Sequence, residues 1–250
     1  MRWKWHVAAL LAVCGSPPLQ AAVVNPSFET GTFAGWAVIG DTTVVSSLGT
    51  AAPTHGTKMA YLHTIGGLDG FAVPQPFLEA FLGLAPGTAD AAFGADVVEG
   101  SIISQTIVNA GAWLLSFDWK FLTDESPGGV PFNDRGFFAL VDPFGALAAF
   151  ATIDTLIPAN FTAGTGGWLH QTAFKPAGSF LLDKTGSYTF YVGVLDIDDS
   201  AFDSALLIDN FVLSPVPPPP PVVAEPASLS LLGVGVGTLW LGRRRRRKAA

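Results

Sequence analysis

The sequence predicts an antiparallel β-sandwich, and three observations support this fold class. Its apolar runs are short, rich in β-branched and aromatic residues, and bounded by Gly, Pro, Asp or Asn. Apolar and polar or small residues nearly alternate in LSFDWKF and TFYVGV, which is typical of half-buried strands. No long helical pattern separates the runs, which favours a sandwich of antiparallel strands. The predicted strands are residues 102–108, 112–122, 136–142, 188–197 and 205–213.

One stretch between the strands has a different period. In residues 74–93, Phe77, Phe81 and Leu84 recur at helical spacing. We expect one or two short helices to be inserted there between strands. The sequence contains no internal repeat of the length found in solenoid proteins. The body has roughly 195 residues, which indicates one domain with a core of its own.

The charge of the chain is unevenly distributed. The formal net charge is −7, but residues 22–216 contain five Lys and Arg residues against nineteen Asp and Glu residues. Binding to nucleic acid needs clustered cations that displace counterions from phosphates, so this body is not expected to bind nucleic acid. An acidic body is better suited to calcium or to neutral ligands.

The first residues have the pattern of a secretory signal peptide. Basic Arg2 and Lys4 precede an apolar run over residues 7–13, and small Ala21 and Ala22 follow two prolines. The pattern predicts a signal peptide over residues 1–21, with cleavage after Ala21. The single cysteine, Cys14, lies inside it, so the mature chain would contain no disulfide. A lipoprotein signal ending at Cys14 is the alternative, although Val13 stands where such signals have a small residue.

The C-terminal end combines a proline-rich linker with a short apolar segment. Residues 214–223 include five consecutive prolines, which favour an extended polyproline rod that cannot join a core. We therefore expect the sandwich domain to span residues 22–213. Residues 227–242 are apolar, but a helix of this length is shorter than the roughly 20 residues that span a bilayer comfortably. The basic run that follows would stay on the cytoplasmic side, leaving the acidic body outside.

The order of parts in residues 224–250 resembles the PEP-CTERM sorting signal of Gram-negative bacteria, which is also catalogued as an "ice-binding protein C-terminal domain". That family has a Pro-Glu-Pro motif, an apolar helix and a basic cluster. Ala224 departs from the motif, since it stands in place of the first proline. The matching positions are Glu225, Pro226, Arg243, Arg244, Arg245, Arg246 and Arg247. The resemblance implies an exosortase-like membrane peptidase as partner, a transient inner-membrane anchor, and a final location at the cell surface or in the extracellular matrix.

Two motifs at opposite ends of the body resemble jelly-roll domains related to carbohydrate-binding modules. NPSFETGTFAGW, residues 25–36, is similar to their opening strand and turn, and SALLIDNFVL, residues 204–213, to their closing strand. The resemblance implies a structural calcium ion held by Glu29 and Asp209, with Asn25 nearby. Calcium prefers six to eight hard oxygen ligands, so a carboxylate from each end of the chain is chemically suitable. The alternative is that Glu29 and Asp209 cap turns or accept backbone hydrogen bonds.

The middle of the body resembles the exported domains that usually carry this sorting tail. The similar segments are LSFDWKFLTDE, NDRGFFALVD and DIDDSAFDSALLIDN. The last segment brings four carboxylates into one loop, and these repel one another unless they are solvated or bridged by a cation. Its carboxylates are Asp196, Asp198, Asp199 and Asp203, with Asp124, Glu125 and Asp134 as possible partners in a second calcium site. A solvated acidic loop is the alternative.

The sequence favours a binding protein over an enzyme. It contains no nucleophile elbow, zinc-protease helix, phosphate-binding loop or dinucleotide fingerprint, and its histidines are scattered. Trp36 and Trp168 stand beside glycines in apparent turns, so they are expected to be exposed and able to stack on sugar rings. Trp113 and Trp119 share one face of a predicted strand and are expected to pack in the core.

The leading hypothesis is therefore a non-enzymatic exported protein that binds a polysaccharide or acts in adhesion. A secreted hydrolase acting on polysaccharides is the second hypothesis, because the acidic body offers many carboxylates. Ice binding is the third, and it would need a regular array of threonines. Thr42, Thr43, Thr54 and Thr57 have no such period.

Overall fold

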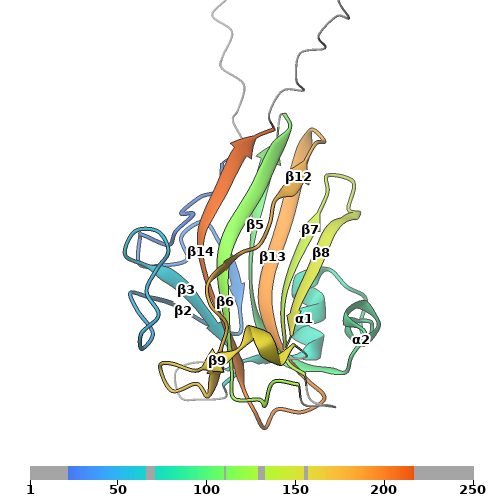
Figure 1. Ribbon diagram of the computed structural model, residues 1–250. Helices are drawn as coiled ribbons and strands as arrows, with labels where there is room; N and C mark the ends of the chain where they lie inside the picture. Colours follow the sequence, from blue (N-terminus) through green and yellow to red (C-terminus); the bar gives the residue numbers. More distant parts are fainter. Residues whose placement is uncertain (1–21, 66–70, 110, 129–132, 155–156, 217–250) are drawn as a thin grey trace, which may run out of the picture. The chain divides into compact units, whose positions relative to one another are not determined.

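The protein folds as a sandwich of two antiparallel sheets, which confirms the predicted fold class (Figure 1). The computed structural model describes residues 22–65, 71–109, 111–128, 133–154 and 157–216. The expected signal peptide, most of the proline-rich linker and the sorting tail lie outside these residues. None of the helices in the described ranges has the length and apolar character needed to cross a membrane.

The six-stranded sheet has its longest strands at the centre. Its order is β1-β5-β13-β7-β8, and the short strand β4 pairs with the other end of β5. The bounds are β1 Ala37–Ile39, β4 Val73–Pro74, β5 Val97–Asn109, β7 Arg135–Val141, β8 Leu147–Asp154 and β13 Gly186–Ile197.

The eight-stranded sheet contains the last strand of the sandwich. Its order is β2-β3-β14-β6-β10-β9, and two further short strands, β11 and β12, pair with β6. The bounds are β2 Asp41–Val45, β3 Met59–His63, β6 Trp113–Thr123, β9 Thr162–Ala163, β10 His170–Gln171, β11 Lys175–Pro176, β12 Phe180–Leu182 and β14 Ser204–Pro215. Consecutive long strands cross between the sheets, because β5 is followed by β6, and β13 by β14, in the opposite layer.

The main core lies between the two sheets and is rich in aromatic rings. The Trp36 ring lies 4.8 Å from the Phe211 ring and 5.4 Å from the Phe190 ring, measured between centroids. Phe28 lies 5.1 Å from Trp36, and it is fully buried. Trp113 and Trp119 pack against the same cluster, as their spacing predicts.

The opening segment differs from the expected strand. Residues 25–36 form turns, and the first strand begins only at Ala37. Asn25 and Phe28 both have positive φ angles, of 50° and 57°, which a strand cannot contain. The segment is held instead by long-range bonds, since the Phe211 N–H donates to the Pro26 carbonyl at 2.9 Å. The chain therefore closes its first turn directly onto its last strand.

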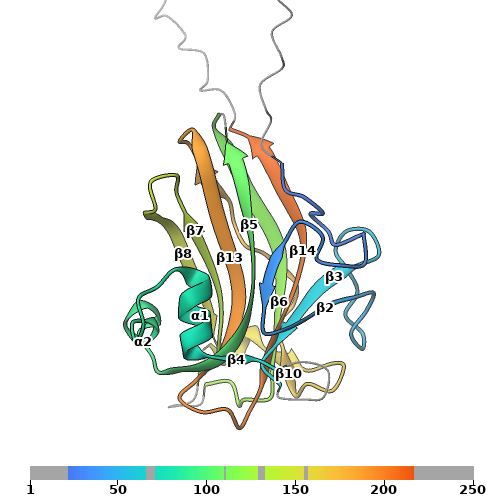
Figure 2. The same ribbon diagram turned by 180° about the vertical axis from the view of Figure 1, so that it is seen from behind.

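The predicted helical stretch contains two helices, α1 Gln75–Leu82 and α2 Ala89–Phe93, between β4 and β5. Figure 2 shows them against the face of the six-stranded sheet that is turned away from the other sheet. Leu78 and Glu79 are the buried residues on α1, while Phe77 is 60% exposed. The helical spacing groups Phe77 with Phe81 and Leu84 on one face, but in the structure the next residue, Leu78, is buried instead of Phe77. The helix ends at Gly83, whose φ of 71° suits glycine.

The outer face of the eight-stranded sheet is partly covered by loops. Trp168 lies in a small buried cluster with Met59, Leu122 and Leu207. Its indole N–H donates to the Tyr61 hydroxyl at 3.2 Å. Both sheets are thus buried on the inside and, over part of their length, on the outside as well.

The buried position of Trp36 gives a stability prediction. Trp36→Ala removes a ring that packs against Phe28, Phe190 and Phe211, so it should lower the free energy of unfolding by about 3–5 kcal/mol. Denaturant unfolding of purified protein measures this. Phe144→Ala is the control, since Phe144 is 80% exposed and its loss should change stability by less than about 0.5 kcal/mol. Equal effects of the two variants would contradict the described core.

Candidate functional site

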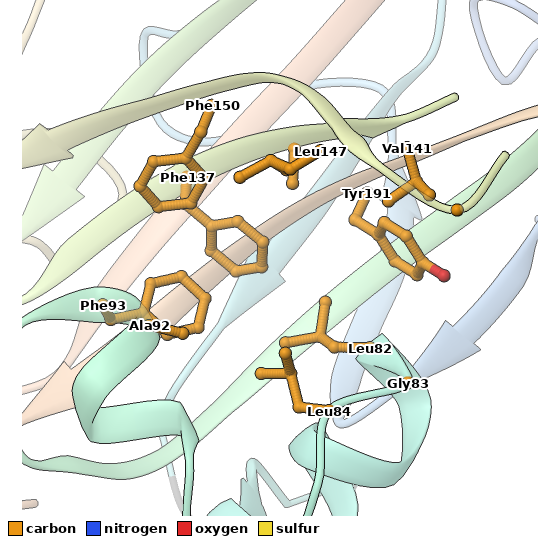
Figure 3. Close-up of a pocket in the computed structure, with 12 residues that line it drawn as sticks. Leu82, Gly83, Leu84, Ala92, Phe93, Phe137, Val141, Leu147, Phe150 and Tyr191 are labelled. Atoms are coloured by element: carbon orange, nitrogen blue, oxygen red, sulfur yellow. The ribbon is translucent and has the colours of Figure 1, made fainter.

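A groove lies between the helical insertion and the six-stranded sheet (Figure 3). It has a volume of about 430 Å³, within the range of about 300–1,000 Å³ that is usual for small-molecule sites. One side comes from α1, α2 and the turn between them, and the floor from β7, β8 and β13. The lining residues are Leu82, Gly83, Leu84, Ala92, Phe93, Phe137, Ala139, Val141, Gly145, Leu147, Phe150 and Tyr191.

The groove exists because β7 is apolar on both faces. Phe138 and Leu140 point into the main core, and the alternate residues Phe137 and Ala139 point outward beneath the insertion. The helices cover only part of this outward face. The remaining part, over β7 and β8, stays open as the groove.

Three phenylalanines line one end of the groove. The Phe93 ring lies 4.9 Å from Phe137 and 5.7 Å from Phe150, measured between centroids, with both pairs steeply inclined. Phe137 is buried, whereas Phe150 is 42% exposed and so can meet a ligand. Figure 3 shows the three rings gathered at one end of the groove, with Tyr191 toward the other.

Tyr191 carries the one polar side chain among the lining residues. Its ring lies 6.1 Å from Phe81 of α1 in an edge-to-face arrangement. Burial raises the pKa of Tyr191, so the hydroxyl stays protonated and remains a hydrogen-bond donor. The groove therefore offers apolar ring faces with one hydroxyl at its edge.

The wall of the groove is fixed by Glu79. Its buried carboxylate accepts hydrogen bonds from the N–H groups of Gly87, Thr88 and Ala89, at 2.8, 2.8 and 2.9 Å. These amides include the first residue of α2, so one side chain of α1 holds the start of the second helix. The same bonds keep the pKa of Glu79 below its usual value. At the other end of α2, Arg135 donates to the Phe93 carbonyl.

Trp36 and Trp168 do not form an exposed pair, so this prediction was wrong. They are only 8% and 6% exposed, and they belong to two different buried clusters. The neighbouring glycines place both in turns, as expected, but these turns are folded against the sheets. Neither indole is available to stack on a sugar.

The structure brings Glu29 and Asp209 to the same loop, residues 54–58. Glu29 accepts from the N–H groups of Thr57 and Lys58, both at 2.8 Å. The Asp209 carboxylate, fully buried, accepts from the His55 N–H at 2.8 Å and from the Thr54 hydroxyl at 3.2 Å.

Asn25 lies in its own turn, where its side chain bonds with the backbone of Thr30 and Thr32.

The carboxylate oxygens of Glu29 and Asp209 are suitable ligands for calcium, but in this structure they accept hydrogen bonds from the protein. The two carboxylates come from the first turn and the last strand, as the resemblance implies, and both meet one loop. Their oxygens, however, accept from N–H and O–H groups of that loop. Within the described ranges, no three His, Cys, Asp or Glu side chains gather closely enough to hold a metal by themselves. The calcium site at Glu29 and Asp209 stays a prediction.

The four carboxylates in residues 196–203 do not gather in one loop. Asp196 is fully buried, whereas Asp198 is exposed with a positive φ of 67°. Asp199 accepts from the Ala201 N–H at 2.8 Å and so closes a turn. Asp203 is half-buried, and burial together with the charge of Asp124 raises its pKa. Asp196 alone of the four is buried between the sheets, on the side of Asp134.

One close carboxylate pair, Asp134 with Asp196, is 1% and 0% exposed, so a polysaccharide cannot reach it. His63 is the last residue of β3, and its Nε2 lies 3.3 Å from the Asp41 carboxylate. Burial lowers the pKa of His63.

One segment of the sequence indicates where the groove lies. GFFALV is a continuous apolar run, and such a run indicates a strand buried on both faces. Together with the inserted helices, it indicates that the insertion covers this strand. The exposed ring of Phe150 was not foreseeable, because β8 is a short edge strand with a mixed pattern.

Comparison with family models finds no match, and comparison with curated proteins finds none. Solved structures with a similar arrangement include a family 61 carbohydrate-binding module in complex with β-1,4-galactotriose. It has 18% identity and a TM-score of 0.44, and the match covers 79% of this chain and 99% of that one.

Two further structures give similar values. A carbohydrate-binding module specific for non-crystalline cellulose has 16% identity and a TM-score of 0.42, covering 79% of this chain and 97% of that one. A cleaved adhesin domain of Lys-gingipain from Porphyromonas gingivalis has 13% identity and a TM-score of 0.42, covering 78% and 99%. At these values the similarities assign no ligand to this chain.

The Glu79 contacts give a prediction for the groove wall. In the wild type, the two carboxylate oxygens of Glu79 accept hydrogen bonds from three N–H groups. Glu79→Gln keeps only one acceptor oxygen, so the amides of residues 87–89 should exchange their hydrogens with solvent faster. Hydrogen exchange followed by mass spectrometry should show faster exchange in α2, with the strands unchanged. Glu99→Gln, which neutralises a carboxylate on the adjacent strand β5, is the control. Unchanged exchange at residues 87–89 would show that Glu79 does not hold the wall.

Proposed function

We propose that this protein is an exported, non-enzymatic binding module that recognises a glycan through the groove between the helical insertion and the six-stranded sheet. The observation that carries the proposal is the partly exposed ring of Phe150, which packs on Phe93 in the same groove as the Tyr191 hydroxyl. An aromatic face can cover the apolar face of a sugar ring, and a hydroxyl can orient it.

Two further facts support a glycan. The body is acidic and poor in cations, so a neutral ligand suits it better than a phosphate or a nucleic acid. The sequence motifs at residues 25–36 and 204–213 resemble those of carbohydrate-binding jelly rolls. One of the solved structures similar to this chain is a carbohydrate-binding module in complex with β-1,4-galactotriose. For the hydrolase alternative, the Asp134 and Asp196 pair is too deeply buried to meet a polysaccharide.

The proposed location follows from the two ends of the sequence. The signal peptide over residues 1–21 would export the chain. The segment with Glu225, Pro226 and Arg243 to Arg247 would hold it briefly in the inner membrane for an exosortase-like peptidase. The module would then act at the cell surface or in the extracellular matrix.

Calcium is proposed as a structural ligand at Glu29 and Asp209. The N–H group of Thr57 holds the pKa of Glu29 below its usual value, so this carboxylate is ionised at neutral pH. Burial raises the pKa of Asp209, and a bound cation would favour its ionised form. The cation would tie the first turn and the last strand to the loop between them.

Binding to glycans tests the groove. Phe150→Ala removes the exposed ring at its mouth and should weaken binding about tenfold or more, as for other central aromatic contacts. A glycan array that includes β-1,4-galactotriose identifies the ligand, and affinity electrophoresis then compares the variants. Phe144→Ala is the matched control, because it removes a more exposed ring from the same β7–β8 hairpin but not from the groove.

Two results would contradict this proposal. One is that no glycan binds to the wild-type protein. The other is that a glycan binds equally well to the wild type and to Phe150→Ala, which would place its site elsewhere on the molecule.

Thermal melting with calcium and with chelator tests the proposed metal. A hundredfold excess of calcium over its Kd should add about 2.7 kcal/mol to the free energy of unfolding. Glu29→Ala and Asp209→Ala should each reduce this gain, whereas Asp96→Asn, which alters an exposed carboxylate on the insertion, should keep it. If calcium raised the free energy of unfolding equally in all variants, Glu29 and Asp209 would be ruled out as its ligands.

A further inference from the structure

A polar cluster lies between the two sheets where β13 ends and β14 begins. Asp196 belongs to the end of β13, and Asp134 directly precedes β7, so both come from the six-stranded sheet. Hydroxyl groups come from the opposite sheet or its loops. They belong to Thr64, Thr123 and Ser204, all fully buried, and Asp134 and Asp196 are 1% and 0% exposed.

The hydroxyls are joined to one another. Ser204 and Thr123 form a hydrogen bond between their side chains at 2.8 Å. The Ser204 N–H donates to the Thr64 hydroxyl oxygen at 2.9 Å, and the Thr64 hydroxyl donates to the Ser204 carbonyl at 3.3 Å. The three hydroxyl groups are therefore linked within one hydrogen-bonded set.

The two carboxylates lack matching donors. Asp134 Oδ1 accepts from the Ile197 N–H at 3.1 Å. In the described part of the chain, Asp134 Oδ2 and both carboxylate oxygens of Asp196 are buried without a hydrogen-bond partner. Such buried oxygens are rare in native proteins and call for a proton, a water or a cation. Among the described residues, neither Asp134 nor Asp196 forms an ion pair with a basic side chain.

Burial changes the acidity of both carboxyl groups. Burial first, and then the charge of Asp134, raises the pKa of Asp196, while burial and the charge of Glu125 raise the pKa of Asp134. The Ser204 hydroxyl lowers the pKa of Asp134 and the Thr64 hydroxyl lowers that of Asp196, so both hydroxyl oxygens lie beside the carboxylates. Isolated buried carboxylates are strongly unfavourable unless a positive charge or a proton compensates them.

We propose that Asp134 and Asp196 bind one calcium ion between the two sheets, with the hydroxyl oxygens of Ser204 and Thr64 beside it. The oxygens present are carboxylate and hydroxyl groups, which are ligands that calcium prefers, and backbone carbonyls or waters would complete its shell. This site is separate from Glu29 and Asp209. Asp209 lies five residues beyond Ser204 along β14, a distance of about 17 Å in a strand.

Calcium titration by calorimetry on the purified, chelator-treated protein tests the site. Asp196→Asn and Asp134→Asn keep the side-chain shape but should each lose one bound calcium per chain. Glu29→Ala should leave this calcium in place, so the result does not depend on the other predicted metal. Asp198→Asn is the matched control, because it removes a charge from the same segment on an exposed residue whose positive φ suits Asn.

Melting in chelator gives a second readout that a merely structural role would not produce. Without calcium, Asp196→Asn should melt close to the temperature of the wild type, since burial keeps the Asp196 carboxyl protonated and the amide that replaces it is likewise uncharged. With calcium, it should melt below the wild type. A variant that melts below the wild type by the same amount in both conditions would show that Asp196 acts only in packing.

Should the variants fail to fold, anomalous scattering from wild-type crystals grown with calcium decides the question. A peak between Asp134 and Asp196 is expected. Its absence at saturating calcium, or a wild-type calcium stoichiometry equal to that of Asp196→Asn, would overturn the proposal and leave a proton shared between the two carboxyl groups as the compensating charge.

Discussion

The contact between the first turn and the last strand holds the sandwich closed. Phe28 and Trp36 lie near the start of the described residues, and Phe211 belongs to β14, yet their rings pack together in the main core. The hydrogen bond from Phe211 to Pro26 and the two bonds between the Gln105 side chain and Val24 fix the same turn to both sheets. The core therefore contains residues from both ends of the described chain.

The second constraint is that the six-stranded sheet is apolar on both faces. A sheet of this kind must be covered on its outer side, and the inserted helices provide that cover. Because α1 and α2 are short, they cover only β5, β13 and part of β7. The groove is the uncovered remainder, and this explains why it is apolar and why it lies beside the edge strand β8.

The long elements could be predicted because their signals are local. The five predicted strands correspond to β5, β6, β7, β13 and β14, and the helical stretch to α1 and α2, since residue type and period decide these elements. The burial of Trp36 and Trp168 could not be predicted in the same way. Their turns are folded against partners far along the chain, such as Phe190 for Trp36 and Tyr61 for Trp168. The different burial of Asp196, Asp198 and Asp199 could not be predicted either, because they are close together in the sequence. Asp196 lies within β13 and is buried, whereas Asp198 and Asp199 follow the strand and are not.

The three amide bonds to Glu79 have a consequence for how a ligand would bind. They set the spacing between α1 and α2 before any ligand arrives, so the wall of the groove does not have to become ordered during binding. A preformed wall removes an entropic cost from association. Differences in affinity among ligands would then arise chiefly from how quickly each one leaves, and the module would discriminate by residence time.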